Sequence, residues 1–338
     1  MARRHREGFI RECHGDLHLG NIAILEDEPL VFDCIEFNDE MRWIDVMNEI
    51  AFTTMDLQDR GRADFAHRFL NAYLEITGDY DGLGVLRFYL VYRAMVRAKV
   101  VLLRANQLSP GDPAAALSNE YRGYVRLAKG YASPSRPAIV ITHGFAGSGK
   151  TTLSQRLLES VGAVRIRTDV ERKRLHGLDP ADHVTASVGR GLYTPEATRD
   201  TYLHALSLTR KAAAAGYAAI VDGAFLKRWQ RDSFRALAEE LGLPFVMLSC
   251  TANEATLRVR IARRLREADD ASDADLAVLD HQLRTHDPLA PEELANTVVY
   301  DVKGARCGAT SPPWQAVLDR LATAGFCSTA AGSSARSE

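Results

Sequence analysis

An eight-residue stretch, GFAGSGKT at positions 144–151, constrains this chain more than any other feature. It places three glycines and a lysine between an apolar run, residues 138–144, and a stretch whose apolar residues have helical spacing. Glycine lets the backbone turn so tightly that successive N–H groups point at one spot, which is also the positive end of the following helix. A strand, a glycine loop and a helix in this order are typical of a site that binds the phosphates of a nucleotide.

The side chains of this loop have separate expected roles. Lys150 would reach the β- and γ-phosphates, and the hydroxyl of Thr151 would bind Mg²⁺. We expect the nucleotide to be ATP, held by the whole loop: Gly144, Gly147, Ser148, Gly149, Lys150, Thr151 and Thr152. An ordinary glycine turn is the competing interpretation, but it does not account for the strand and the helix on either side.

Apolar runs alternate with helical stretches after this loop. Runs of this kind occur at residues 138–144, 164–169, 217–223, 244–250 and 297–302. Five runs separated by helices predict an α/β domain with a five-stranded parallel sheet and right-handed crossovers.

The composition changes sharply at residues 132–137, ASPSRP, where two prolines and two serines indicate a linker. We therefore expect one domain at residues 1–131 and a second at residues 138–326, followed by a small, polar, disordered tail at residues 327–338. The first domain has a short β region at residues 21–37. It should otherwise be mostly helical, with helices predicted at residues 43–57, 63–76, 86–106 and 114–129.

Composition argues against several classes of protein. The chain has 338 residues and 46% hydrophobic content, which is enough for two domains with cores of their own. A formal net charge of -2 gives no general argument for nucleic acid as a partner, so nucleic acid is not favoured. The five cysteines form no C-x-x-C pair, which argues against a zinc site or a disulfide framework. No run approaches the length of a membrane span, so we expect a cytoplasmic protein without membrane contact.

Two aspartates stand at the ends of predicted strands. Asp169 ends the run at residues 164–169, and Asp222 lies near the end of the run at residues 217–223. Open parallel sheets bind their ligands at the carboxyl ends of their strands. Asp222, on the strand beside the glycine loop, would stand near Mg²⁺, and Asp169, one strand further out, would take a proton from an acceptor hydroxyl. The alternative role for each aspartate is to cap a helix.

Residues 256–266, TLRVRIARRLR, predict a helix dense in arginine. Phosphoryl transfer spreads negative charge over the transferred oxygens, and a mobile arginine lid would stabilise that charge. Arg260 and Arg264 are four residues apart and share one face of this helix. The competing interpretation is an ordinary solvated surface.

The motifs GFAGSGKTT, RTDVERKR and RIARRLR resemble the kinase branch of P-loop proteins that includes polynucleotide kinase, chloramphenicol phosphotransferase, gluconate kinase and zeta toxin. The resemblance implies ATP-dependent phosphorylation of an alcohol group, with Asp169 as general base. It also implies that Arg172 contacts the acceptor and that residues 185–202 shape the acceptor pocket. It does not specify which small molecule is the acceptor.

The first domain contains a second kinase-like pattern, HGDLHLGN at residues 14–21. This spacing lets one loop offer Asp16 to an attacking hydroxyl and Asn21 to Mg²⁺, while a hairpin returns Asp33 to the same metal. The pattern resembles the aminoglycoside phosphotransferase family, in which the position of Asp45 supports the loop. The expected fold is thus a mostly helical lobe of a protein-kinase-like fold, preceding the P-loop kinase domain.

Only residues 1–13 precede His14. The lobe that covers the nucleotide in that family would therefore be missing, through a truncated gene model or through loss in evolution, and we expect this domain to be inactive alone. The favoured function is an ATP-dependent small-molecule kinase with catalysis in the second domain. The alternatives are a regulatory nucleotide-binding protein with a kinase-like scaffold and an NTP hydrolase.

Overall fold

A computed structural model gives the arrangement of residues 2–107, 114–134, 137–182, 191–267 and 274–301, together with residues 318, 319 and 322. The predicted tail and residues 135 and 136 of the predicted linker lie outside the described residues. The chain divides into two compact units. The first comprises Met1–Leu70 and Asp79–Pro134, and the second comprises Asn71–Gly78 and Ser135–Glu338.

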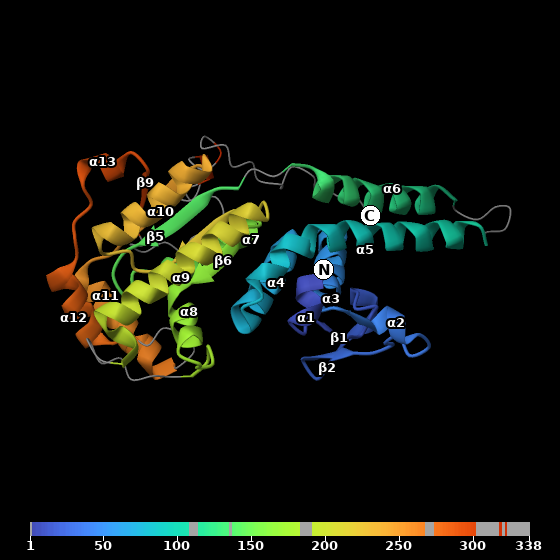
Figure 1. The fold of residues 1–338 in the computed structure, drawn as a ribbon, viewed down its shortest axis with the longest axis horizontal. Coiled ribbons are helices and arrows are strands. Elements are labelled where there is room, and N and C mark those ends of the chain that lie inside the picture. Colours follow the sequence, from blue (N-terminus) through green and yellow to red (C-terminus); the bar gives the residue numbers. More distant parts are fainter. Residues whose placement is uncertain are drawn as a thin grey trace. The chain divides into compact units, whose positions relative to one another are not determined.

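The first unit is mostly helical, with two small antiparallel sheets. Its elements are α1 (Ala2–Arg6), β1 (Ile10–Glu12), η1 (Leu19–Asn21), β2 (Ile22–Leu25), β3 (Glu28–Val31), α2 (Asp39–Arg42), β4 (Trp43–Asp45), α3 (Val46–Asp59), α4 (Ala63–Thr77, whose second half belongs to the second unit), η2 (Tyr80–Gly82), α5 (Leu83–Ala105) and α6 (Ala114–Ala132). The long helices α5 and α6 lie side by side, and α3 packs against α5 (Figure 1). Met47, Phe52 and Met55 of α3 and Leu86 of α5 are fully buried in this core.

Residues 43–45 form a strand, and not the start of the helix predicted at residues 43–57. Trp43, Ile44 and Asp45 pair with the three residues of β1. The carboxylate of Asp45 then caps α3 by accepting a hydrogen bond from the N–H of Met47 at 2.9 Å. The apolar spacing runs from the helix back into the strand, so periodicity alone placed the helix start too early.

A buried ion-pair cluster joins α1 to two later segments of the first unit. Arg4 is 3% exposed. Its Nε and Nη2 each donate a hydrogen bond to Asp45 at 2.7 Å, while Nη1 and Nη2 donate to Asp79 at 2.7 and 2.8 Å. All of these bonds are charge-assisted, and one guanidinium compensates two buried carboxylates.

The second unit is built on a five-stranded sheet whose neighbouring strands are all parallel. Its strands are β5 (Ile139–His143), β6 (Val164–Arg167), β7 (Ala219–Asp222), β8 (Phe245–Thr251) and β9 (Thr297–Asp301). They lie in the order β6-β7-β5-β8-β9. The strand order reverses at β5, because β6 and β7 lie on one side of it and β8 and β9 on the other. A ligand crevice therefore opens at the carboxyl end of β5.

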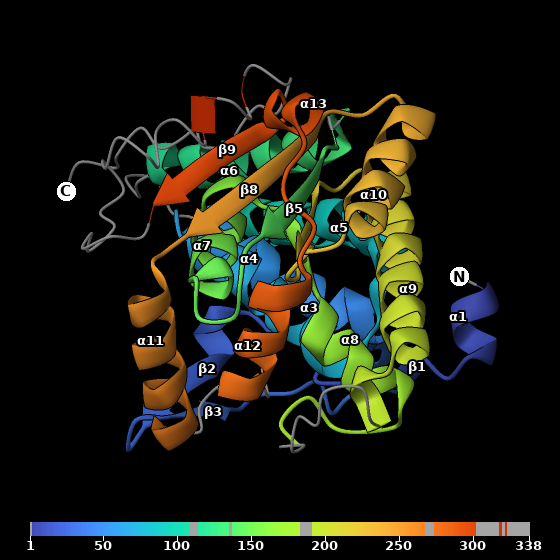
Figure 2. The same cartoon turned by 90° about the vertical axis from the view of Figure 1, so that its left-hand side faces the viewer.

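Helices cover both faces of this sheet. They are α7 (Lys150–Val161), α8 (Thr168–Leu175), η3 (Gly191–Tyr193), α9 (Pro195–Ala214), α10 (Arg228–Leu241), α11 (Glu254–Glu267), α12 (Leu276–Thr285) and α13 (Pro291–Leu294). Helix α7 lies on one face, and α9 and α10 lie on the other (Figure 2). Leu153 and Leu157 of α7 join Val140, Ile220 and Leu248 of the sheet in one buried cluster.

These observations confirm the predicted fold class: a mostly helical first part and a five-stranded parallel sheet flanked by helices. Strand β7, which carries Asp222, pairs directly with β5, and β6 lies one strand further out, as predicted. Among the described helices, none has both the length and the apolar character needed to cross a membrane.

We predict that Arg4→Met destabilises the first unit by about 3–5 kcal/mol, because it leaves two carboxylates buried without their cation. The measurement is equilibrium unfolding in urea, followed by circular dichroism. Arg3→Met is the matched control: Arg3 is 57% exposed in its pairs with Glu7 and Asp81, and such pairs contribute about 1 kcal/mol or less. Equal unfolding midpoints for the two variants would contradict the prediction.

Candidate active site

The glycine loop connects β5 to α7, and its backbone has the conformation that only glycine adopts readily. Gly144, Gly147 and Gly149 have φ angles of 141°, 76° and 91°. A Cβ atom on Gly144 would lie 2.4 Å from the carbonyl oxygen of Cys250, and one on Gly147 would lie 2.9 Å from that of Leu257. The loop therefore packs against β8 and α11 at distances that exclude any side chain.

Lys150 begins α7 and turns back over the loop. Its ammonium donates hydrogen bonds to the carbonyl oxygens of Gly144 and Phe145 at 2.9 and 2.8 Å. Burial lowers the pKa of Lys150 below its usual value, and the nearby Asp222 opposes that effect. The ammonium thus lies at the loop with no bonded carboxylate among the described residues, where it is available to a phosphate oxygen.

Asp222 ends β7 and is 5% exposed. Two buried hydroxyl groups lie against its carboxylate. Ser154 donates to Oδ2 at 2.9 Å, while the hydroxyl of Thr142 donates to the carbonyl oxygen of Gly223 at 2.8 Å and lies 3.4 Å from Oδ1. Thr168 donates to the backbone carbonyl of Asp222 at 3.1 Å. The carboxylate is therefore oriented from β5 and α7, the two elements that also carry the loop.

Asp169 is the second residue of α8, since β6 ends at Arg167. The prediction that Asp169 ends the strand was wrong by two residues, because an acidic residue is favourable in the first turn of a helix. Its carboxylate pairs with Arg167 at 2.8 Å and accepts a hydrogen bond from the N–H of Val170 at 2.9 Å. Burial would raise the pKa of Asp169, but Arg167 outweighs burial and lowers the pKa below its usual range.

The arginines of α11 differ in their surroundings. Arg260 reaches the carbonyl oxygen of Gly147 at 3.4 Å, and Arg264 donates to that of Ala274. Both line the pocket described below, as does Arg263. Arg258 instead pairs with Glu254 and Asp280 outside the pocket.

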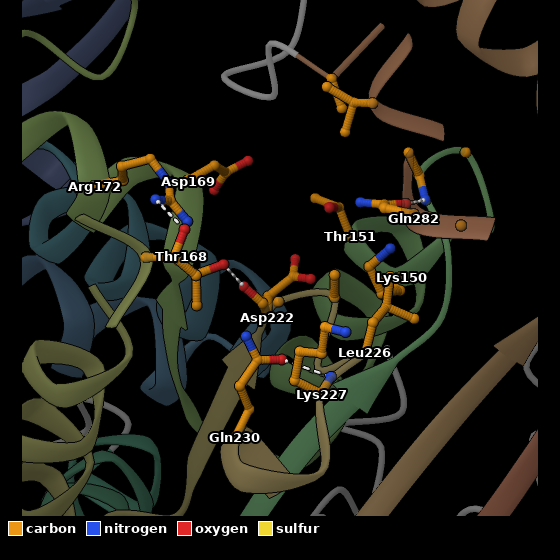
Figure 3. A pocket seen from close by; sticks show the side chains of 18 of the residues that line it. Lys150, Thr151, Thr168, Asp169, Arg172, Asp222, Leu226, Lys227, Gln230 and Gln282 are labelled. Atoms are coloured by element: carbon orange, nitrogen blue, oxygen red, sulfur yellow. Dashed lines mark hydrogen bonds between the residues drawn. The ribbon is translucent and has the colours of Figure 1, made fainter. Parts of the chain in front are cut away.

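One pocket of about 940 Å³ is lined by most of the residues predicted for this site, but not by Gly144 or Ser148 of the loop. Lys150 and Thr151 lie on one side, Asp169 and Arg172 lie on the other, and Asp222 stands between them (Figure 3). Tyr193, Thr198 and Tyr202, from the segment predicted to shape the acceptor pocket, also line it. Residues 185–190 of that segment lie outside the described residues.

Several site residues were not foreseen from the sequence. Gln282 of α12 accepts a hydrogen bond from the loop N–H of Ala146 at 2.8 Å (Figure 3). Lys227, directly before α10, and Trp229, its second residue, also line the pocket. Only Ser154 carried a sequence signal, because it follows Thr151 by three residues and therefore shares its helix face.

Thr151 and Asp222 fit Mg²⁺ by their chemistry, since a hydroxyl and a carboxylate give the oxygen ligands that this ion prefers. Both side chains line the same pocket. The described residues contain no group of three or more His, Cys, Asp or Glu that could hold a metal ion alone. A magnesium ion here would take its remaining ligands from phosphate oxygens and water.

The kinase-like pattern of the first unit is also assembled. The side-chain amide of Asn21 donates to the backbone carbonyls of Asp16 and Asp33 at 3.1 and 3.5 Å, and it approaches the carboxylate of Asp16 at 3.4 Å. Asp33 has a φ angle of 60°, which is uncommon for a residue other than glycine. The side-chain amide of Asn21 thus lies against Asp16 and the backbone of Asp33 within one loop and hairpin.

Family comparisons agree with both patterns. Residues 2–89 match the model of the phosphotransferase enzyme family, and residues 139–289 match that of the AAA domain. The chain joins a phosphotransferase-family segment to an AAA domain. These matches confirm the two resemblances, and the AAA domain here is the P-loop unit whose pocket is described above.

The chain also has relatives along most of its length. Uncharacterized proteins of Mycobacterium tuberculosis and Mycobacterium bovis are each 32% identical over 272 residues, which is 80% of this chain and 54% of the relative. The chain therefore spans about half the length of the curated relatives it matches.

Solved structures with some similarity to part of the chain include proteins described as kinases. An unliganded sugar kinase from Janibacter has a TM-score of 0.40 at 20% identity, covering 58% of this chain and 98% of its own. A putative kinase from Chloroflexus aurantiacus has a TM-score of 0.43 at 16% identity, covering 56% and 99%.

A buried histidine lies directly before the loop of the AAA domain. Nδ1 of His143 is 2.9 Å from the hydroxyl of Ser249, and its Nε2 is buried without a hydrogen-bond partner in the described part of the chain. Burial, with help from Arg231 and Lys150, lowers the pKa of His143 to about 4. The native protein therefore holds this ring neutral.

We predict that His143 makes the protein less stable as the pH falls from about 6.5, the ordinary histidine pKa, to about 4. In that window His143 is protonated in the unfolded chain but stays neutral in the native protein. The free energy of unfolding therefore falls by up to about 1.4 kcal/mol for each pH unit. Urea unfolding at pH 7 and pH 5 measures this loss. His143→Gln should reduce it, whereas the exposed-histidine control His5→Gln should not. An unchanged pH dependence in His143→Gln contradicts the prediction.

Proposed function

We propose that the AAA domain transfers the γ-phosphoryl group of ATP to a hydroxyl group of a small molecule. One observation carries this proposal: Lys150, Thr151, Asp222 and Asp169 line a single pocket at the carboxyl ends of β5, β6 and β7. These groups supply the phosphate contact, the two metal ligands and the base that phosphoryl transfer requires.

Binding of ATP would change the partners of Lys150. Its ammonium would leave the carbonyl oxygens of Gly144 and Phe145 for the β- and γ-phosphates, where its charge is better compensated. Mg²⁺ bound with the nucleotide would neutralise further phosphate charge. Arg260 and Arg264 would add positive charge from α11, which lines the same pocket.

Asp169 would act as the base. It accepts the proton of the acceptor hydroxyl while the hydroxyl oxygen bonds to the γ-phosphorus. The bond from that phosphorus to the bridging oxygen breaks, and ADP leaves with the electron pair. The lowered pKa of Asp169 keeps it ionised at neutral pH, and a weak base suffices because the transition state is loose.

The extent of the pocket supports transfer over simple hydrolysis. Beyond Asp169 it continues to Arg172, Tyr193 and Trp229. A water molecule needs no such space, whereas an acceptor with several functional groups does. A purely regulatory nucleotide site has no use for a carboxylate and an arginine on the side away from the loop.

We predict that Lys150→Ala weakens nucleotide binding or turnover severely, because each lost charge-assisted contact is worth about 1.5–3 kcal/mol. Binding is measured with a fluorescent ATP analogue. Turnover is measured as ADP release in the presence of sugars, nucleosides, aminoglycosides and 5′-hydroxyl oligonucleotides. The exposed Lys211→Ala on α9 is the control for a lost lysine charge. Unchanged affinity and turnover in Lys150→Ala would rule out this loop as the nucleotide site.

We also predict that substitutions of Asp169 and Asp222 affect different measurements, the rate of phosphoryl transfer for Asp169 and the Mg²⁺ dependence of nucleotide binding for Asp222. Asp169→Asn should lower transfer by roughly 10²–10⁴ while leaving Mg-ATP affinity nearly intact, because only the base is lost. Asp222→Asn should instead weaken the Mg²⁺ dependence of nucleotide binding. The measurements are single-turnover transfer and ATP titrations at several Mg²⁺ concentrations. If both variants lose nucleotide affinity equally, the assignment of separate roles is wrong.

A further inference from the structure

We propose that the acceptor carries an anionic group, a carboxylate or a phosphate, and that Arg172 binds it. This inference rests on the proposed function and specifies the chemical class of its acceptor. It also predicts that cationic molecules such as aminoglycosides are poor acceptors for the AAA domain, although residues 2–89 match the model of the phosphotransferase enzyme family.

The first argument is that Arg172 is buried without a carboxylate partner. The residue is 8% exposed, and its Nη1 donates to the carbonyl oxygen of Leu192 at 2.8 Å and to the hydroxyl of Thr198 at 3.3 Å. Its guanidinium also lies 5.0 Å from the centre of the Tyr193 ring. Both partners of Nη1 are neutral. Nε and Nη2 have no hydrogen-bond partner among the described residues.

The nearby carboxylate of Asp169 does not pair with Arg172, because it is bonded to Arg167 at 2.8 Å. Asp169 therefore acts on Arg172 only from a distance, and no anion in the described part of this pocket wall is bonded to the guanidinium.

Such a charge is costly in the absence of a ligand. A guanidinium keeps its proton even when buried, so it cannot relieve the cost by becoming neutral. Burial is the main influence on Arg172 and lowers its pKa from the usual value. Its free N–H groups form a planar fork that suits the two oxygens of a carboxylate or a phosphate. An incoming oxyanion would supply the missing charge.

The position of Arg172 assigns this anion to the acceptor and not to ATP. Arg172 and Asp169 lie across the pocket from Lys150 and Thr151, with Asp222 between them (Figure 3). Asp169 and Arg172 are three residues apart on α8, so they share one helix face about 5–6 Å apart at their Cβ atoms. An acceptor whose hydroxyl meets Asp169 would place a group a few bonds away against Arg172.

The surrounding side chains suit a small organic body between these two polar groups. Tyr193, Tyr202 and Trp229 line the pocket, with the Tyr193 ring 5.0 Å from the Arg172 guanidinium and the Trp229 ring packed edge to face on Tyr202. Their apolar surfaces can cover a carbon chain or a ring. They carry no negative charge that could offset the repulsion between a cationic acceptor and Arg172. A hydroxylated carboxylic acid or a phosphorylated alcohol satisfies all of these features.

The first test measures binding and does not depend on turnover. The protein is saturated with Mg²⁺ and a non-hydrolysable ATP analogue, so that the glycine loop is filled, and is then titrated with inorganic phosphate or acetate in a thermal-shift assay. Sodium chloride at matched ionic strength is the reference. We expect phosphate, acetate or both to raise the melting temperature beyond the chloride reference, and the two arms distinguish a phosphate acceptor from a carboxylate acceptor.

Arg172→Met should weaken that anion response by about tenfold or more. Arg210→Met on α9, which removes a surface arginine paired with Glu240, should leave it unchanged. Without ligand, Arg172→Met should melt at the same temperature as the parent protein or higher, because it removes an uncompensated buried charge. A response to neither anion, or a response that persists in Arg172→Met, overturns the inference. If Arg172→Met melts at a lower temperature but keeps the full response to the anions, Arg172 has only a structural role, and the inference is overturned as well.

A second test compares acceptors in matched pairs, D-gluconate with D-glucitol and glycerol 3-phosphate with glycerol, by ADP release. Where a pair is turned over, the anionic member should have the higher kcat/KM, and Arg172→Met should remove that advantage. Equal rates within such a pair overturn the inference while leaving the kinase proposal intact. Failure of the protein to bind Mg-ATP refutes the proposed function instead, whatever the response to phosphate and acetate.

Discussion

The contact between the backbone of the glycine loop and the carbonyl groups of Cys250 and Leu257 determines the geometry of the rest of the site. Because no Cβ atom fits at Gly144 or Gly147, the loop lies directly on the end of β8 and on α11. The position of the loop is thus set by the sheet on one side and by α11, which carries Arg260 and Arg264, on the other. Lys150 and Thr151 follow the loop immediately, so their positions depend on that contact.

Buried hydroxyl groups extend this rigidity to the carboxylate at the pocket centre. Thr142 belongs to the strand before the loop, and Ser154 belongs to the helix after it, and both contact Asp222. Both side chains are fully buried, so these contacts form in a low-dielectric environment where hydrogen bonds are strong. The strand before the loop and the helix after it therefore both contact the Asp222 carboxylate, and the hydrogen bond from Ser154 is charge-assisted.

Sequence patterns predicted the parts of this protein that depend on local chemistry. The glycine loop, the five parallel strands and the placement of Asp222 beside β5 follow from short motifs and apolar runs. The predicted start of α3 and the predicted end of β6 before Asp169 were each wrong by a few residues. Helix capping determines where these helices begin, and the periodicity of apolar residues does not record it. Gln282 and Arg167 were not foreseen. Gln282 reaches Ala146 from a distant segment, and Arg167 acts on Asp169 through a side-chain pair that no pattern records.

The central position of β5 also affects how the chain folds during synthesis. Its two partners, β7 and β8, are both encoded far downstream, with β6 and three helices in between. Parallel strands cannot pair until such crossovers are complete, so this apolar strand leaves the ribosome several seconds before either partner. Both edges of β5 are unpaired in that interval, and an unpaired apolar edge is a template for aggregation. The strand that carries the nucleotide loop is thus exposed to aggregation until β7 and β8 have been synthesised.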